Sequence, residues 1–209
     1  MSSEISKSYW EKLAKSIKDP AETTNKRKKQ YLQTDINFVK KHLEKKDSIL
    51  DVGSGSGLVV NALKGSVKEI VAVETFKGLS NFIDEEILVI NAELTGFQIR
   101  KKFDKIVSTG LTHFFPEEDI VKIYANIFEM LKTGGKLIMR SHCGLKEKVV
   151  INGYSEELSS YYFTEYRTVE TEKGILKSLG FKDIKIFDEV ADELNVWENT
   201  RHYYFVCSK

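Results

Sequence analysis

The sequence predicts an α/β fold of the doubly wound type, in which a mostly parallel sheet carries helices on both faces. Three observations predict it. Apolar runs typical of buried strands alternate with segments of helical periodicity along most of the 209 residues. The first such run ends in a glycine-rich turn, GSGSG at residues 53–57, that leads into a helical pattern. The next run ends in an acidic residue, Glu74, at the spacing of about 20 residues that is typical of a site between neighbouring strands.

The individual elements follow from hydrophobic spacing and from turn signals. Apolar runs bounded by polar or glycine residues predict seven strands, at residues 48–52, 70–74, 87–91, 103–108, 136–140, 181–190 and 202–208. Helical spacing predicts helices at residues 9–17, 25–43, 58–63, 79–82, 120–131 and 171–179.

The connections between strands predict their directions. Strands joined by helical segments are expected to be parallel, because a parallel pair needs a crossover. The connection 191–201 is short and lacks a strong helical pattern, which favours an antiparallel terminal pair. We therefore expect a seven-stranded, mostly parallel sheet with an antiparallel C-terminal hairpin. We expect one domain over residues 1–209, with a helical extension at 1–46 and the α/β core at 47–209.

Composition narrows the class of protein. Lys and Arg total 32 and Asp and Glu total 31, a net charge of +1 that argues neither for nor against a polyanionic partner. No apolar stretch approaches roughly 18 residues, and the N-terminus lacks the apolar core of a signal peptide. Two cysteines are too few for a disulfide framework, and no Cys/His cluster has metal-ligand spacing. We expect a cytoplasmic protein without a membrane segment or a bound metal; the sequence carries no signal for its oligomeric state.

The glycine turn indicates the kind of ligand. Glycine adopts positive φ angles without steric cost, and its missing side chain lets backbone N–H groups approach a ligand. The carboxylate of Glu74 can accept two hydrogen bonds from a ribose diol. The spacing is G-x-G-x-G rather than the dinucleotide pattern G-x-G-x-x-G, and Asp51 precedes it. An acid there would repel a pyrophosphate and suits an ammonium or sulfonium group. The alternative is a glycine loop that serves only as a tight turn.

Several stretches resemble segments of class I S-adenosylmethionine-dependent methyltransferases, in the same order. Residues 50–57, LDVGSGSG, resemble the first motif of that family. Residues 90–94 resemble the loop after the third strand, with Asn91 where many members have aspartate. Residues 103–110 resemble the fourth strand, and 131–138 resemble the turn before the fifth, with Thr133 in place of the usual proline.

The resemblance implies a Rossmann-like sheet in the strand order 3-2-1-4-5-7-6, with S-adenosyl-L-methionine as cofactor. It implies that Asp51 and the glycine backbone surround the methionine moiety and that Glu74 binds the ribose hydroxyls. It places the adenine amine near Asn91 and the methionine amino group at the end of the fourth strand. The expected cofactor contacts are Asp51, Gly53, Ser54, Gly55, Gly57, Glu74, Thr75, Asn91, Ala92, Ser108 and Thr109.

Catalytic candidates stand where later strands end. A methyl group on a sulfonium is already electrophilic, so the protein must mainly align a nucleophile and exclude water. A hydroxyl acceptor also needs a base, and His113 or His142 could supply it. Arg140 could pair with a substrate carboxylate or phosphate. Each could instead have a packing role. His42 and His202 are expected to be structural and away from the crevice.

Three further segments leave alternatives open. Residues 154–166 are rich in aromatic side chains and form either a substrate-facing wall or a partly exposed helix packed on the sheet. The N-terminal helix with Tyr9 and Trp10 is either a lid over the cofactor or a packed extension. The basic run 26–29, KRKK, either contacts phosphate or is a solvated helix face.

The leading hypothesis is methyl transfer to a small-molecule acceptor, for example a sugar or metabolite hydroxyl. One alternative is a cofactor-binding module without transfer activity, and another is an RNA- or nucleotide-directed methyltransferase. Residues 108–111, STGL, stand where amino-group methyltransferases of bases carry Asn/Asp-Pro-Pro-aromatic, which argues against that nucleic-acid reaction. A dinucleotide oxidoreductase is disfavoured by the glycine spacing and by Asp51.

Overall fold

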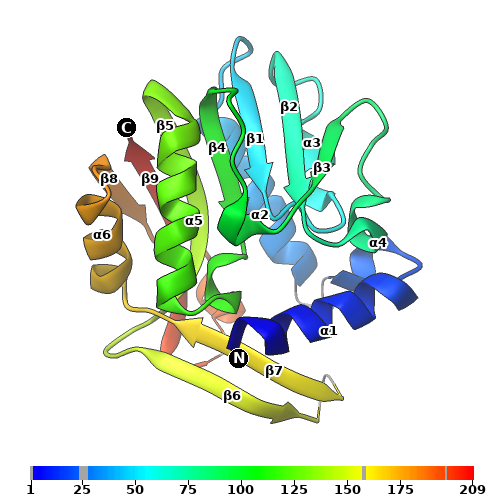
Figure 1. The fold of residues 1–209 in the computed structure, drawn as a ribbon. Helices are drawn as coiled ribbons and strands as arrows, with labels where there is room; N and C mark the ends of the chain where they lie inside the picture. The colour runs from blue at the N-terminus through cyan, green and yellow to red at the C-terminus, as the bar shows by residue number, and fades with distance from the viewer. Residues whose placement is uncertain (1, 24–27, 157–158, 196) are drawn as a thin grey trace.

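A seven-stranded sheet forms the centre of the molecule (Figure 1). The computed structural model describes residues 2–23, 28–156, 159–195 and 197–209. The strand order is β3-β2-β1-β4-β5-β9-β8, and β9 runs antiparallel to both of its neighbours while the pairs from β3 to β5 are parallel. The predicted order and the antiparallel C-terminal hairpin are confirmed. The strands are β1 Ser48–Val52, β2 Glu69–Glu74, β3 Leu88–Asn91, β4 Phe103–Thr109, β5 Leu131–Gly144, β8 Lys182–Phe187 and β9 Thr200–Ser208.

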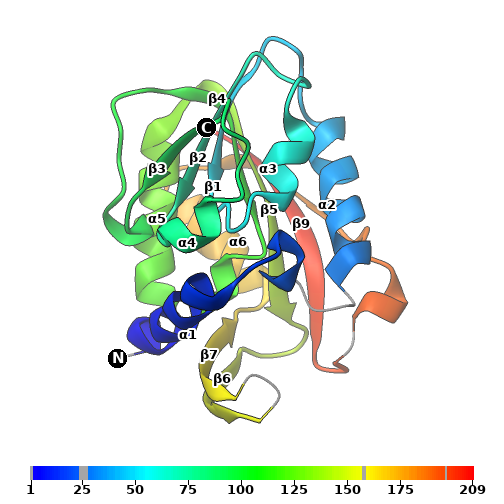
Figure 2. The same cartoon turned by 90° about the vertical axis from the view of Figure 1, so that its right-hand side faces the viewer.

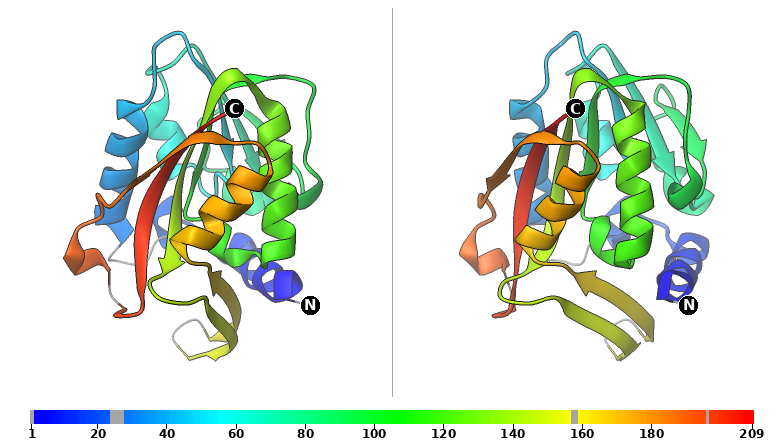
Figure 3. Two further views of the ribbon diagram at one scale, coloured as in Figure 1. Left: turned by 90° about the vertical axis from the view of Figure 1, so that its left-hand side faces the viewer. Right: turned by 60° about the vertical axis from the view of Figure 1, so that its left-hand side comes forward.

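Helices cover both faces of this sheet, as Figure 3 shows. α5 (Glu117–Met130) and α6 (Val169–Ser178) lie on one face, and α2 (Lys28–Lys41) and α3 (Leu58–Leu63) lie on the other. Neighbouring residues of a strand point to opposite faces, so Leu50 packs in the α5 core while Ile49 packs in the α2 core. The short helix α4 (Lys77–Ser80) follows β2. This arrangement buries every residue of β1, as a parallel strand with both faces covered requires.

The strand β5 is longer at both ends than the predicted 136–140. At its start, the pairing with β4 jumps from Phe103 opposite Leu131 to Lys105 opposite Lys136, so the glycine turn forms an irregularity within the strand. Gly134 has φ 74° there, a conformation that favours glycine. At its other end, β5 continues to Gly144 because β9 pairs with it as far as Thr200. The extra length thus comes from pairing with a distant segment.

The aromatic segment 154–166 is part of a β-hairpin, so the packed helix, one of the two alternatives for this segment, is wrong. β6 (Val149–Ser155) pairs antiparallel with β7 (Ser160–Tyr166) as a separate two-stranded sheet. Burial alternates along β6, as expected for a strand with one face covered. The aromatic and β-branched residues of this segment favour a strand over a helix.

The N-terminal helix lies against this hairpin. α1 (Ser2–Ser16) begins earlier than the predicted 9–17, and a 3-10 turn, Pro20–Thr23, follows it. Ser6 Oγ donates to the carbonyl oxygen of Phe163 in β7 over 3.0 Å. Figures 1 and 2 show α1 and the hairpin lying across the carboxyl ends of the parallel strands.

Within the described ranges, no helix is both long enough and apolar enough to cross a membrane. The same part of the chain holds no group of three or more His, Cys, Asp and Glu side chains arranged to bind a metal ion. Cys143 and Cys207 are free and buried, and both pack in the apolar core as small side chains. In the basic run 26–29, residues 26 and 27 and the side chains of 28 and 29 lie outside what the structure describes.

Candidate functional site

A cavity of about 910 Å³ opens at the carboxyl ends of the parallel strands. The glycine loop after β1 and the ends of β2 and β4 form one part of its wall. Residues of α1 and of the β6–β7 hairpin form the part that faces these strand ends. Ligands of open α/β sheets bind at this edge, outside the carboxyl ends of the strands.

The glycine loop is held against β2 by backbone hydrogen bonds. The N–H groups of Gly53 and Ser54 both donate to the carbonyl oxygen of Val73, over 2.9 and 3.1 Å. Gly53 has φ 74° and Gly55 has φ 55°, so both occupy the left-handed region. A Cβ on Gly53 would lie 2.6 Å from Leu111, whereas a Cβ on Gly55 would meet nothing within 4 Å. A side chain at Gly53 would therefore require Leu111 to move, whereas Gly55 leaves open space for a ligand.

Glu74 connects the end of β2 to this loop. Its Oε2 accepts the N–H of Gly55 over 2.9 Å, and its Oε1 accepts the N–H of Phe76 over 2.9 Å. The side chain is only 6% exposed, and burial raises the pKa of its carboxyl group. Each carboxylate oxygen keeps capacity for another hydrogen bond. Glu74 can therefore accept hydrogen bonds from the two hydroxyls of a diol while it also holds the glycine loop through Gly55.

Asp51 lies at the end of β1 beneath the loop and lines the cavity. Burial raises the pKa of its carboxyl group to about 7, the nearby charge of Glu74 adds to this, and a hydrogen bond from Ser54 opposes it. In the described part of the chain, no cationic side chain is among the groups that shift this pKa. A ligand cation placed here would supply the missing compensation, so the site suits an ammonium or sulfonium group.

The other expected cofactor contacts divide into two groups. Those that line the cavity, besides Asp51 and Glu74, are Gly53, Ser54, Gly55, Thr75 and Thr109. Those that the cavity lining does not include are Gly57, Asn91, Ala92 and Ser108.

Asn91 links neighbouring elements at the edge of the site through its side-chain amide. Its Nδ2 donates to the backbone carbonyl of Glu74 over 3.0 Å and to Ser80 Oγ over 2.9 Å. The side chain thus ties β3 to β2 and α4. The lining after β3 comes instead from the three residues at 93–95, which the sequence analysis missed. Their position just beyond the third strand was the signal that could have identified them.

Arg140, at the end of the parallel part of β5, is held in a buried ion pair. Its Nε donates to Asp35 Oδ1 over 2.7 Å, and Tyr204 Oη donates to the same oxygen over 2.7 Å. Its Nη1 lies 2.9 Å from Nδ1 of His202. Burial would lower the pKa of the guanidinium, but Asp35 outweighs it and the pKa is raised. Asp35, which the sequence analysis did not identify, leaves Arg140 charged and oriented along the cavity wall.

His142 and His202 stack face to face, with ring centroids 3.8 Å apart. Burial, followed by the charge of Arg140, lowers the pKa of His142 to about 3, so its imidazole is neutral at neutral pH. Both rings line the cavity. The expectation that His202 lies away from the crevice is wrong, because β9 pairs with β5 in a register that sets His202 opposite His142. His42 packs on Phe38 and does not line the cavity, as predicted.

Aromatic rings surround the remaining part of the cavity. Trp10 of α1 packs edge-on against Phe114, at 5.0 Å between centroids, and Phe114 also contacts Tyr162 of β7 at 6.0 Å. His113 stacks on Tyr166 at 5.7 Å. All five of these rings line the cavity. Segment 154–166 therefore does form an aromatic wall, built by strands. α1 packs on that wall through Tyr9, whose ring lies 5.8 Å from that of Tyr162.

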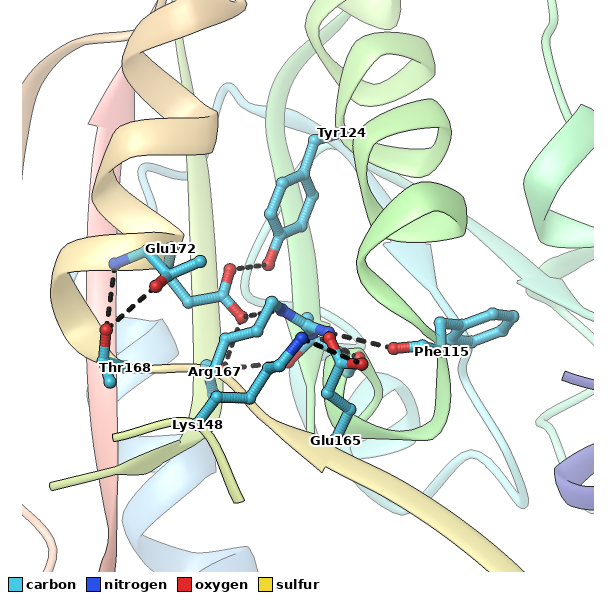
Figure 4. A network of polar contacts seen from close by, with 10 residues as sticks. Phe115, Tyr124, Lys148, Glu165, Arg167, Thr168 and Glu172 are labelled. Carbon is cyan, nitrogen blue, oxygen red and sulfur yellow. Dashed lines mark hydrogen bonds and ion pairs between the residues drawn. The ribbon is translucent and has the colours of Figure 1, made fainter. Parts of the chain in front are cut away.

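Arg167 was not among the candidates from the sequence, although it belongs to the same region. Its side chain is fully buried behind the aromatic wall and makes hydrogen bonds to the backbone of the turn that carries His113 (Figure 4). Sequence patterning offered no signal beyond an arginine that follows a run of aromatic residues.

Comparisons with known proteins find a matching domain and a matching fold. Residues 50–139 match the family described as "Methyltransferase domain". A solved complex of DhpI with SAM and HEP superposes with a TM-score of 0.77 at 11% identity, covering 99% of this chain and 97% of that one. A possible histamine N-methyltransferase from Thermotoga maritima superposes with a TM-score of 0.71 at 13% identity. The superposition covers 96% of this chain and 99% of that one. A phosphoethanolamine N-methyltransferase from Haemonchus contortus superposes with a TM-score of 0.66 at 13% identity. The superposition covers 93% of this chain and 61% of that one. At these identities the superpositions show a shared fold.

A curated relative adds a match in sequence. An uncharacterized protein of Methanocaldococcus jannaschii is 30% identical over 103 residues, which are 49% of this chain. The match covers 38% of that relative's length.

Proposed function

We propose that this chain is a class I S-adenosylmethionine-dependent methyltransferase that transfers the methyl group of S-adenosyl-L-methionine to a small-molecule acceptor. The match of residues 50–139 to a methyltransferase domain and the shared fold support this proposal. One observation carries the proposal. The cradle made by Gly55, Glu74 and Asp51 and the aromatic wall around Phe114 line the same cavity. The cradle side of the cavity suits a ligand with a diol and a cationic group. The aromatic side suits a second, less polar molecule.

The residues present fit the cofactor. Glu74 accepts from the ribose hydroxyls, Asp51 faces the positively charged methionine end, and the open side of Gly55 lets the backbone approach. The cofactor supplies an electrophilic methyl group on a sulfonium. What remains for the chain is to bind the acceptor in line with that methyl group and to exclude water.

The acceptor is held between the aromatic wall and the end of β5. Neutral His142 is too weak a base to deprotonate a hydroxyl efficiently, since catalytic bases work best with a pKa near the working pH. His113, which lines the cavity from the turn after β4, is the proposed base for a sugar or metabolite hydroxyl. Arg140 and its partner Asp35 form a neutral pair, in which Arg140 can still donate hydrogen bonds to an acceptor oxygen.

An amine acceptor is the second candidate, and the lining of the cavity favours it. Among the residues that the structure describes, six carboxylates and two cationic side chains, Lys7 and Arg140, line the cavity. Aromatic faces also attract ammonium groups. Two of the solved relatives named above are N-methyltransferases, of phosphoethanolamine and, as a possible assignment, of histamine. The two acceptor classes differ in their need for His113.

Two other functions stay as alternatives, namely a cofactor-binding module without transfer and an RNA- or nucleotide-directed enzyme. The aromatic wall that lines the cavity supports a small acceptor over a nucleic acid. We propose a reducing cytoplasm as the compartment, which the two free cysteines support.

The first experiment is calorimetric titration with S-adenosylhomocysteine, with NAD as the control ligand. We expect S-adenosylhomocysteine to bind and to raise the melting temperature, while NAD does neither. The second experiment supplies S-adenosylmethionine labelled at the methyl group together with a panel of amines, hydroxyls, carboxylates and short RNAs. Binding without transfer to any of these would support the binding module, and no binding at about millimolar cofactor would rule out the proposed function.

A further inference from the structure

We infer that Arg167 is a positioning residue for the acceptor side of the site. It acts through the turn Thr112–Phe114 that follows β4, and it does not itself touch the cavity. Arg167 lies directly after β7, and its side chain has no exposed surface. Figure 4 shows the guanidinium pointing from the hairpin toward the turn and toward α5 and α6.

The guanidinium holds both ends of this turn. Its Nη2 donates to the carbonyl oxygen of Thr112 over 2.7 Å, and its Nη1 donates to the carbonyl oxygen of Phe115 over 2.9 Å. The N–H of Phe115 also donates to the carbonyl oxygen of Thr112 within the turn, over 3.4 Å. Two donors of one rigid, planar group thus fix two carbonyls three residues apart.

Residues of this turn form a large part of the cavity wall. His113 and Phe114 line the cavity, as do Leu111 and Phe115 on either side. The side chain of Leu111 occupies the space beside Gly53, where a Cβ would lie 2.6 Å from it. A shift of the turn would therefore move the acceptor wall.

Two carboxylates orient the guanidinium. Its Nε donates to Glu172 Oε1 over 3.0 Å, and its Nη1 lies 3.2 Å from Glu165 Oε1. Glu172 in turn accepts from Tyr124 Oη over 2.7 Å, and Glu165 lies 3.8 Å from Lys148 Nζ. Burial alone would lower the pKa of Arg167, but the charge of Glu172 outweighs it, so the guanidinium stays charged.

This network is better explained by positioning than by stability. Desolvation cancels much of the gain of a buried ion pair, so such a pair adds little net stability over apolar residues of similar size. An apolar side chain, however, cannot donate to the carbonyls of Thr112 and Phe115. The hydrogen bonds of Arg167 therefore fix the position of the turn relative to the hairpin, α5 and α6.

The test compares Arg167→Ala with Arg201→Ala by amide hydrogen exchange. Arg201 is a matched control because it also forms ion pairs, with Asp188 and Asp192, yet makes none of the contacts to the turn. In Arg167→Ala we expect exchange at the Phe114 and Phe115 amides to rise about tenfold or more, while β1 keeps its protection. Millimolar guanidinium chloride should refill the space and restore protection. Arg201→Ala should leave the exchange rates of the Phe114 and Phe115 amides unchanged.

Tryptophan fluorescence, measured in a Trp197→Phe background, gives an independent readout, because Trp10 packs on Phe114 and is then the one remaining tryptophan. Its emission should shift in Arg167→Ala and return with guanidinium. The proposal is overturned if the two amides stay protected, if protection falls equally throughout the core, or if guanidinium restores nothing. Should Arg167→Ala not fold, Arg167→Lys replaces it; a lysine cannot reach both carbonyls, so partial loss of protection at the two amides is expected. If neither variant folds, Arg167 is a stability element and the proposal fails.

This inference rests on the proposed function only where it calls the turn part of the acceptor wall. Exchange and fluorescence are measured without acceptor or turnover, so they can succeed or fail separately from methyl transfer. Affinity for S-adenosylhomocysteine, measured in parallel, should change less than about threefold in Arg167→Ala, since the cradle of Glu74 and Asp51 does not contact Arg167.

Discussion

The backbone N–H of Gly55 donates to Oε2 of Glu74 over 2.9 Å, so the glycine loop and the end of β2 form one unit. The other carboxylate oxygen accepts from Phe76, and the side chain has little exposed surface. Glu74 therefore shapes the loop and, in the proposed function, also binds the ribose.

Replacing Glu74 tests both parts of this role. Glu74→Gln keeps the size of the side chain but turns one acceptor oxygen into a donor, which opposes a backbone N–H or a ribose hydroxyl. We expect the affinity for S-adenosylhomocysteine to fall by about 1–3 kcal/mol, as for the loss of hydrogen bonds to a charged group. Glu69→Gln, at the exposed start of the same strand, is the control and should bind normally. Equal affinity in the two variants would place the ribose contact elsewhere.

Cofactor affinity should depend on pH through Asp51. Its pKa is raised to about 7, so near neutrality much of the free protein carries a protonated carboxyl group. A cationic ligand favours the carboxylate, so binding lowers this pKa and releases a proton. The affinity for S-adenosylhomocysteine should therefore rise as pH increases from about 6 to about 8, and level off above the pKa of the free protein. Calorimetry in buffers of different ionisation enthalpy measures the released proton, and Asp51→Asn should abolish the dependence.

Gly53 and Gly55 should respond differently to alanine. Both have positive φ, so either substitution places an L-residue in the left-handed region at a cost of about 1–2 kcal/mol. Only Gly53→Ala also collides with Leu111, so it should lower the melting temperature more. Gly55→Ala has free space around the new methyl group and should instead weaken S-adenosylhomocysteine binding. Full affinity in Gly55→Ala would show that the cofactor does not approach this side of the loop.

His142 should stay neutral across the physiological pH range. Burial and the charge of Arg140 lower its pKa from 6.5 to about 3. A nuclear magnetic resonance titration of the imidazole signals should show that one histidine, identified by its loss in His142→Gln, does not titrate above about pH 5. A titration midpoint near the ordinary pKa of 6.5 would mean that the ring is more hydrated than its stacking on His202 implies. His142 would then again be a candidate for the catalytic base.

Local patterns predicted the elements whose limits are marked by their own residues. The strand β1 and the helix α3 match their predicted bounds, because a continuous apolar run and a glycine-bounded helical segment are both local signals. The limits of β5 were not predicted, since its start depends on pairing with β4 and its end on pairing with β9. Segment 154–166 carried aromatic residues compatible with either a helix or a strand, and its pairing with residues 149–155 decided between the two.

By itself, the sequence determined the fold class, the strand order that the resemblance implies, and the cradle of Asp51, Gly55 and Glu74. These residues lie at strand ends, and parallel strands bring their carboxyl ends to one edge whatever the rest of the chain does. Only the tertiary structure decided what surrounds Arg140 and the acceptor turn. Asp35 meets Arg140 across 105 positions of the chain, His202 across 62, and Arg167 meets Thr112 across 55. Such contacts depend on strand register and on side-chain direction in the assembled core, and no local pattern records them.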